Sequence, residues 1–351
     1  MSDIISKDKF CERPHLVILG AGATVATIPF GDKNGRKASC MDNFIKELNM
    51  EAILDGVRLQ TAGTNLEDIY SELHDRTDCT EVREALEQRI YDYFRCLELP
   101  DQATIYDLLI LSLRPKDCIA TFNWDGLLVD AYNRVKKITG HLPNLIFLHG
   151  NVNVSYCPNC NSYGNRRERC PRCNKETITP RLLYPVKQKD YTSDPFIKRQ
   201  WEDFERYLED CSILTIFGYS APKTDIEAVD KLQKAFARLY NNRFLDHIEI
   251  IEKPGFNRAE ISKAWIELSS HTHGHLCLIE SFYDSYLAQF PRRSIEGYFK
   301  SNIEGWWGNP TISFTKDITT LASAQALISP LLKDEKMNTT EVTSSSIKRN
   351  F

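Results

Sequence analysis

The spacing of four cysteines is the clearest chemical signal in the sequence. Cys157 and Cys160 form one CxxC pair, Cys170 and Cys173 form a second, and a proline follows the first cysteine of each pair. Each pair places two thiolates on one tight turn, and Zn²⁺ takes four such ligands in a tetrahedron. A site made only of thiolates keeps no open position for a substrate, so we predict a structural zinc module over residues 151–180. The alternative is four ordinary cysteines in a basic loop.

A histidine lies just ahead of the first cysteine pair. The apolar run Leu145–Leu148 is typical of a buried strand, and it ends at His149-Gly150. Imidazole exchanges protons near neutral pH, which suits a residue that accepts a proton from water or from a hydroxyl group. The zinc module would then support His149. A histidine at the end of a strand can equally be a structural residue.

Polar or glycine-rich segments follow three further apolar runs, and a glutamate follows a fourth. Residues 15–19 lead into a glycine turn, residues 117–122 into Asn123-Trp124-Asp125, residues 212–217 into Gly218-Tyr219-Ser220, and residues 247–251 into Glu252. The glycine turn consists of Gly20, Ala21, Gly22, Ala23 and Thr24. Glycines in such a turn allow backbone N–H groups to approach a pyrophosphate.

These strand ends also have ordinary structural interpretations. The dinucleotide-binding fingerprint has a third glycine where Val25 stands, so the turn can equally join a strand to a helix without any ligand. Asn123 or Asp125 can equally cap the helix that begins near Gly126.

Strands alternate with helices along the chain, which predicts an α/β fold with a doubly wound, Rossmann-like, mostly parallel sheet. The carboxyl ends of such strands meet at one edge, so the polar strand ends predict a single site. The region 31–114 has helical spacing over 41–59 and three further helices, one of them capped by Asn65, and we interpret it as a helical insertion. Residues 281–335 form a C-terminal extension, and residues 336–351 are expected to be a disordered tail.

The composition narrows the classes of partner. The 351 residues carry a net charge of −4 with 26% charged residues, which gives no reason to expect a nucleic-acid or membrane partner. The 11 cysteines leave an odd number outside the zinc pairs, which argues against a disulfide framework. No signal peptide opens the chain, and no apolar run reaches the roughly 18 residues that span a bilayer, so we expect a cytoplasmic protein.

The order of these motifs resembles the sirtuin family. That family has a GAG turn, a helical insertion, a T-x-N-x-D strand end, an H-G strand end, two CxxC pairs and a G-x-S strand end, and the same series runs through residues 14–280. The resemblance implies NAD⁺ as substrate, lying across the strand ends. It implies that Gly20–Thr24 and Ser220 hold the phosphates of NAD⁺, with Gly218 beside them. Asn123 and His149 would flank the nicotinamide ribose, and Asp125 would hold the carboxamide group of nicotinamide. Phe30 would cover the nicotinamide, and Glu252 would contact the adenine ribose.

The sequence departs from the deacetylase branch of that family in two segments. Residues 24–32 read TVATIPFGD, without the arginine that follows the phenylalanine in deacetylases. Residues 182–191 read LLYPVKQKDY, with Tyr184, Pro185 and Lys187 where the acyl-lysine tunnel runs. This second segment, together with NLEDIYSEL in the insertion, is similar to bacterial sirtuin-like domains of anti-phage defence systems, which hydrolyse NAD⁺. With the tunnel narrowed, water is the available nucleophile.

We therefore expect an NAD⁺ glycohydrolase that depletes NAD⁺ in antiviral defence, with Asn123, His149 and Asp125 as catalytic residues. Cleavage of the nicotinamide–ribose bond builds positive charge on the sugar, and His149 would take the proton while Asn123 orients the nucleophile. Two alternatives stay open: a protein lysine deacetylase, and a non-catalytic module that binds NAD or ADP-ribose. The resemblance also implies a homo-oligomer, or a partner defence protein such as an ATPase or an Argonaute-like protein.

Overall fold

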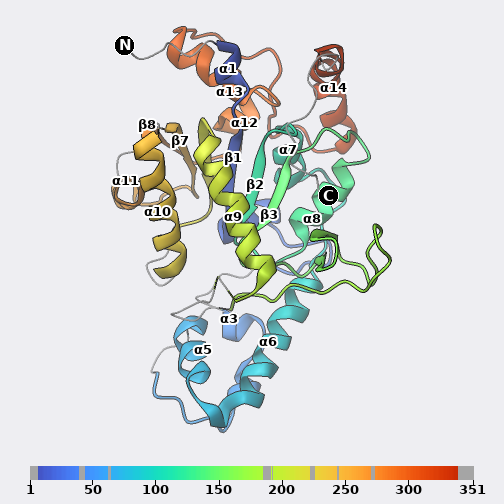
Figure 1. The fold of residues 1–351 in the computed structure, drawn as a ribbon, viewed down its shortest axis with the longest axis vertical. Coiled ribbons are helices and arrows are strands. Elements are labelled where there is room, and N and C mark those ends of the chain that lie inside the picture. Colours follow the sequence, from blue (N-terminus) through green and yellow to red (C-terminus); the bar gives the residue numbers. More distant parts are fainter. Residues whose placement is uncertain are drawn as a thin grey trace.

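The computed structural model describes residues 7–38, 44–61, 65–184, 191, 193–221, 226–242, 245–269 and 273–338. Its centre is a sheet of six strands (Figure 1). The strands are β1 (His15–Leu19), β2 (Cys118–Thr121), β3 (Asn144–Phe147), β6 (Ile213–Phe217), β7 (Leu245–Ile251) and β8 (His273–Ile279). They lie in the order β3-β2-β1-β6-β7-β8, and every neighbouring pair is parallel. This confirms the predicted doubly wound α/β fold.

The strand order reverses next to β1. From β1 the chain adds β2 and β3 on one side, and it later crosses over to add β6, β7 and β8 on the other. Such a topological switch point opens a crevice at the carboxyl ends of the two central strands, and ligands of open α/β sheets bind there. In this sheet the switch point lies where Leu19 of β1 pairs with Phe217 of β6.

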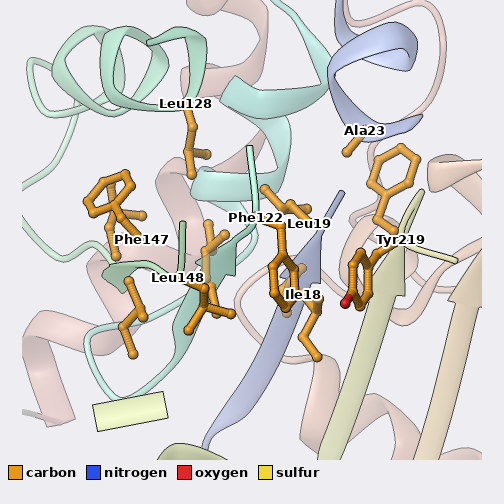
Figure 2. Close-up of a cluster of buried hydrophobic side chains, with 14 of the residues drawn as sticks. Ile18, Leu19, Ala23, Phe122, Leu128, Phe147, Leu148 and Tyr219 are labelled. Carbon is orange, nitrogen blue, oxygen red and sulfur yellow. The ribbon is translucent and has the colours of Figure 1, made fainter. Parts of the chain in front are cut away.

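Helices enclose the sheet on both faces. All five residues of β1 and all five of β6 are buried, although successive side chains of a strand point to opposite faces. Between the strands of the sheet the chain forms α2 (Ala21–Thr27), α7 (Ile105–Leu111), α8 (Leu127–Val135), α9 (Pro195–Asp210), α10 (Ile226–Asn242) and α11 (Arg258–Ser269). Near the strand ends, Phe122 stacks face to face on Tyr219 with ring centroids 4.1 Å apart (Figure 2). Among the described residues, none of the helices is both long and apolar enough to cross a membrane.

The helical insertion lies beyond the carboxyl ends of the strands (Figure 1, blue to cyan). It contains α3 (Phe44–Glu47), α4 (Glu51–Leu54), α5 (Leu66–His74), a 3₁₀ turn (Thr77–Cys79) and α6 (Thr80–Arg95). The predicted cap is confirmed, because the side chain of Asn65 accepts the N–H of Glu67 at 2.8 Å. The continuous helical spacing over 41–59 was misleading: Asn49 has a φ of 51° and separates α3 from α4. A left-handed residue ends a right-handed helix.

Aromatic contacts attach this insertion to the strand ends. Phe94 of α6 packs edge-on against Trp124, with ring centroids 5.6 Å apart. Tyr184 packs against Tyr70 of α5 at 5.6 Å, and its hydroxyl group donates to the carbonyl oxygen of Glu87 at 3.2 Å. Tyr184 therefore faces the insertion, while Pro185 and Lys187 lie outside the described residues.

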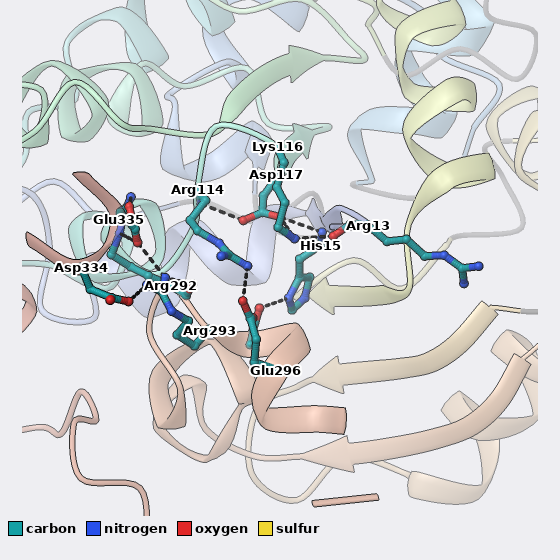
Figure 3. A network of polar contacts seen from close by, with 11 residues as sticks. Arg13, His15, Arg114, Lys116, Asp117, Arg292, Arg293, Glu296, Asp334 and Glu335 are labelled. Atoms are coloured by element: carbon teal, nitrogen blue, oxygen red, sulfur yellow. Dashed lines mark hydrogen bonds and ion pairs between the residues drawn. The ribbon is translucent and has the colours of Figure 1, made fainter. Parts of the chain in front are cut away.

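The C-terminal segment covers the opposite edge, where the strands begin (Figure 1, orange to red). It contains a 3₁₀ turn (Phe282–Asp284), α12 (Tyr286–Gln289), α13 (Ser294–Tyr298), a π-helical turn (Phe299–Ile303) and α14 (Leu321–Asn338), and α1 (Lys7–Cys11) packs beside α13. Ser294 contacts the Nδ1 atom of His15, at the start of β1, at 2.8 Å. Charged side chains complete this contact (Figure 3). Residues 336–338 of the expected disordered tail belong to helix α14, and the rest of that tail lies outside the described residues.

Candidate active site

Four of the predicted strand ends meet at the carboxyl edge of the sheet. Gly20 follows β1, Gly218 follows β6, Asn123 lies two residues beyond β2, and His149 lies two residues beyond β3. Because β1, β2, β3 and β6 are adjacent and parallel, these residues lie at one edge. The topology therefore brings them to the same side of the sheet as the switch point.

The two glycine turns are packed backbone against backbone at the switch point. The N–H of Gly20 donates to Phe217 O and the N–H of Gly22 donates to Gly218 O, both at 3.0 Å. A Cβ on Gly20 would lie 2.4 Å from the carbonyl oxygen of Gly218, so no larger residue fits without movement of the backbone. These two N–H groups serve the fold, so any phosphate at this turn must use its other donors.

Asn123 is hydrogen-bonded to the glycine turn. Its Nδ2 atom donates to Gly20 O at 2.8 Å and to Thr24 Oγ1 at 3.0 Å. A third donation goes to the hydroxyl oxygen of Tyr106 at 3.2 Å. The side chain is half-buried. These contacts fix the position of the amide between the ends of β1 and β2.

Asp125 is buried beneath this turn. It is 3% exposed, and its two carboxyl oxygens accept from Thr24 Oγ1 at 2.8 Å and from the N–H of Leu127 at 3.0 Å. Burial raises the pKa of Asp125, while the hydrogen bonds from Thr24 and Leu127 oppose the rise. The bond to Leu127 is a helix-capping contact at the start of α8. A role in holding the nicotinamide carboxamide stays a prediction.

Thr24, Asn123 and Asp125 form a polar cluster with two further residues, Tyr106 and Asn151, that were not identified from the sequence. Tyr106 is fully buried, and its hydroxyl oxygen lies 2.9 Å from Thr24 Oγ1. Asn151 donates to Asp125 O at 2.6 Å, so the loop after β3 is bonded to the loop after β2. Tyr106 lies in an apolar helix and has no local signal of a polar role. Asn151, two residues beyond His149, follows a strand end and could have been noticed.

His149 is enclosed next to this cluster. It is 7% exposed, its Nε2 atom lies 2.7 Å from the hydroxyl oxygen of Tyr191, and its ring packs edge-on against Phe122 at 4.8 Å. Its carbonyl oxygen accepts the N–H of Leu183 at 3.0 Å. Gly150 has a φ of 79°, and a Cβ there would lie 2.4 Å from a backbone carbonyl oxygen. The turn after β3 therefore requires glycine.

The remaining predicted residues are half-buried or exposed at the protein surface. Phe30 is 96% exposed, and Ser220 is also exposed. Glu252 is half-buried, and its carboxyl group accepts the N–H of Lys253 at 3.0 Å. Their proposed contacts with NAD stay predictions.

The four cysteines of the two CxxC pairs form one cluster. Their Sγ atoms all lie within 4.8 Å of one another, and those of Cys157 and Cys173 are 3.6 Å apart. Zn–S bonds of about 2.3 Å give tetrahedral S–S edges of about 3.8 Å, so the donor set fits Zn²⁺. The N–H of Arg172 points to the Sγ atom of Cys170 at 3.4 Å and lowers the pKa of that thiol to about 6. The cluster could hold a structural zinc ion.

The cysteine cluster stands on a two-stranded hairpin that is attached to the strand before His149. The hairpin consists of β4 (Val154–Cys157) and the antiparallel β5 (Ser162–Asn165). The hydroxyl group of Tyr163 donates to the carbonyl oxygen of Leu145 in β3 at 2.6 Å. Tyr156 also stacks on Phe196 of α9, with ring centroids 5.3 Å apart. The hairpin that carries the cysteine cluster is therefore bonded to β3, the strand that leads to His149.

The solved structures to which the chain is similar include those of Sir2 homologues. One is a Sir2 homologue in complex with NAD, with 14% identity and a TM-score of 0.33 over 77% of this chain and 86% of that chain. A second concerns the mechanism and regulation of Sir2 enzymes, with 15% identity and a TM-score of 0.34 over 77% and 98%. No family model and no curated protein matches the sequence. Structural likeness at this low identity and TM-score does not indicate the function, which must be inferred from the residues of the chain itself.

Proposed function

We propose that the chain is an NAD⁺ glycohydrolase that cleaves the nicotinamide–ribose bond. One observation carries the proposal: Asn123 is hydrogen-bonded to Gly20 and Thr24 at the switch point of the sheet. His149 stands at the end of the next strand. A glycine turn, a fixed amide and an imidazole at the carboxyl edge are the groups that such a reaction needs. The order of the motifs along the chain supports the same activity.

The reaction places separate demands on these residues. Water attacks the anomeric carbon of the ribose while the bond to nicotinamide breaks, and the bonding electron pair leaves with the nicotinamide nitrogen. The water proton passes to His149 and from there to solvent, and the products are nicotinamide and ADP-ribose. The half-buried amide of Asn123 orients the nucleophile, since its Nδ2 atom is already held by Gly20 and Thr24. The carboxyl group of Asp125 accepts a hydrogen bond from Thr24 Oγ1 and so keeps Thr24 in place beside Asn123.

Biological role and assembly extend this proposal. We place the enzyme in the cytoplasm as a defence effector that depletes NAD⁺, by the resemblance of its motifs to anti-phage sirtuin-like domains. Assembly into a homo-oligomer, or onto an ATPase or Argonaute-like partner, would use the C-terminal segment. There Trp307 is 92% exposed and Ile303 is 56% exposed, and exposed aromatic anchors are typical of interfaces.

The proposal is tested by nicotinamide release from NAD⁺, measured with and without an acetyl-lysine peptide. Release without peptide is expected. Asn123→Ala and His149→Ala should each lower it by about 10²- to 10⁴-fold, the range for loss of a group that positions or transfers a proton. His74→Ala is the matched control, because His74 lies in the insertion with 44% of its side chain exposed. Full activity in either site variant refutes the mechanism.

Two other results would reassign the protein. Release in proportion to added acyl peptide would make it a lysine deacetylase. Saturable binding of NAD or ADP-ribose without turnover would make it a non-catalytic binding module.

A further inference from the structure

Aromatic side chains enclose the imidazole of His149. Phe122 meets it edge-on, with ring centroids 4.8 Å apart and planes at 78°. The ring of Tyr191 lies on another side at 5.7 Å, and its hydroxyl oxygen lies 2.7 Å from Nε2. Tyr191 itself is 2% exposed. The side of the ring that carries Nε2 therefore faces a tyrosine rather than open solvent.

Both enclosing rings are held by further aromatic contacts. Tyr191 packs edge-on against Trp201 of α9, with ring centroids 5.1 Å apart, and the indole N–H of Trp201 donates to Leu148 O at 3.2 Å. Phe122 stacks on Tyr219 at 4.1 Å with nearly parallel planes (Figure 2). Four rings from four segments thus form one packed wall. Interiors packed in this way yield little to an incoming group.

We propose that Tyr191 determines which nucleophile is accepted, by filling the space beside Nε2 of His149 so that water enters and larger acceptors are excluded. This inference rests on the proposed function, because it concerns the second substrate of the same site. An alcohol that approaches His149 must bring its carbon chain beside its oxygen, where the ring of Tyr191 lies. Tyr191 acts on the reaction through this space and through His149, and it is a specificity-determining residue.

The excluded reaction is the alcoholysis of NAD⁺. An alcohol oxygen bonds to the anomeric carbon, the bond to nicotinamide breaks, and the electron pair leaves with the nicotinamide nitrogen. The alcohol proton passes to His149 in place of the water proton. The products are nicotinamide and O-alkyl-ADP-ribose, and no oxidant or further reactant takes part.

Two variants separate the ring of Tyr191 from its hydroxyl group. Tyr191→Phe keeps the ring and removes the hydrogen bond to Nε2, while Tyr191→Ala removes both. Each is incubated with NAD⁺ in buffer that contains 1-butanol, and the ratio of O-butyl-ADP-ribose to ADP-ribose is measured by mass spectrometry. The wild type and Tyr191→Phe should give ADP-ribose almost alone. Tyr191→Ala should raise the ratio by at least about tenfold, the discrimination expected of one packed group.

A product ratio is independent of how much active enzyme each preparation contains, so partial unfolding does not imitate the effect. Tyr283→Ala is the matched control, because it removes a half-buried tyrosine ring that packs against Phe282 at 5.6 Å in the C-terminal segment. Its ratio should equal that of the wild type. An unchanged ratio in Tyr191→Ala overturns the proposal.

A second measurement keeps the test separate from the proposed function. Diethyl pyrocarbonate acylates accessible imidazole, and the modification of His149 is followed by peptide mass spectrometry. His149 should react slowly in the wild type and in Tyr191→Phe, and much faster in Tyr191→Ala. If no variant cleaves NAD⁺ but this order holds, the hydrolase proposal fails while the enclosure of His149 stands. Equal reaction rates in all three proteins refute the enclosure.

Discussion

The two edges of the sheet are held by different chemistry. At the edge where the strands begin, charged groups hold the C-terminal segment (Figure 3). The ion pair Arg114–Glu296, at 2.7 Å, joins the segment to the loop before β2. Within the segment, Arg292–Glu335 at 2.6 Å and Arg293–Asp334 at 2.8 Å join the loop before α13 to α14. At the edge where the strands end, the cluster around Asn123 contains one carboxyl group, Asp125, whose partners are a hydroxyl group and a backbone N–H.

The two edges also differ in whether the charged and polar side chains there find their partners inside the protein. Arg292 is 1% exposed, and besides Glu335 it donates to the carbonyl oxygens of Leu113 at 2.9 Å and His141 at 3.0 Å. Its charge is compensated within the protein. Asn123 is only half-buried and is held by neutral groups. One edge is therefore closed by matched charges, and the other has a half-buried neutral amide near its surface.

Removal of zinc should have the largest effect, and it should damage the carboxyl edge first. Cys170→Ser should destabilise the protein by several kcal/mol, because binding of a structural metal is coupled to folding. Nicotinamide release should fall with it, since Tyr163 bonds the module to Leu145 of β3. Thermal unfolding and elemental analysis measure this, with Cys277→Ser, an exposed cysteine of β8, as control. Unchanged melting in a protein without zinc would contradict the zinc assignment.

Loss of the buried arginine should damage the amino edge alone. Arg292→Met removes one partner of a buried ion pair, which typically costs about 3–5 kcal/mol. Urea unfolding should show this loss while the KM for NAD⁺ stays unchanged, because the proposed active site is at the other edge. Lys7→Gln breaks the exposed pair with Glu304 and serves as the control, for which no measurable change is expected. A large rise in KM for Arg292→Met would show that the two edges are coupled.

A buried glutamate in the middle of the sheet should make the stability of the protein sensitive to pH. Glu249 of β7 accepts from the N–H of Tyr286 at 3.0 Å and from Thr215 at 3.2 Å, and burial raises its pKa from 4.5 to about 7. The folded protein therefore keeps a proton that the unfolded chain loses above pH 4.5. The resulting stabilisation is complete below pH 4.5 and is lost as the pH rises to about 7.

Glu249→Gln should remove this dependence. Relative to the wild type, its free energy of unfolding should rise between pH 4.5 and about 7 and then stay level. The total rise should be about 3 kcal/mol, at about 1.4 kcal/mol per pH unit. Burial lowers the pKa of His15 to about 3, which gives an opposite slope in both proteins. If the free energies of unfolding of the two proteins changed with pH in parallel, the raised pKa of Glu249 would be contradicted.

The smallest effect is expected from a single hydroxyl group at the carboxyl edge. Thr24→Val removes the donor to Asp125 and the acceptor for Asn123, which should cost about 1–3 kcal/mol because a buried polar group loses its partner. The KM for NAD⁺ should rise as Asn123 loosens. Thr27→Val is the control on the same helix, since its hydroxyl group donates only to the carbonyl oxygen of Ala23. Equal effects of the two substitutions would remove Thr24 from the site.

Local sequence patterns predicted the strand ends and the cysteine cluster, because each depends on residues adjacent in the chain. A short apolar run followed by glycine or a polar residue is typical of a buried strand and its end. The pattern also indicated the cap at Asn65. It did not indicate the break at Asn49, where spacing alone gives no warning of a left-handed residue.

Contacts between distant segments could not be predicted in this way. Tyr191 reaches His149 across 42 positions, and Arg292 reaches Leu113 across 179. Tyr106 looks like any core residue of an apolar helix until Thr24 and Asn123 are placed beside it. Strand β8 was also missed, since its sequence HGHLCLI has only a short apolar stretch. It pairs with β7 along the edge of the sheet.

The strand that carries the glycine turn is synthesised long before its partner. Residue 15 of β1 pairs with residue 213 of β6, and Gly22 donates to Gly218. At ribosomal rates of about 5–20 residues per second, roughly 10–40 s pass between these two segments. During that time the nascent chain has one of the two glycine turns and lacks the other. The proposed NAD⁺-cleaving activity would therefore begin only after most of the chain has left the ribosome.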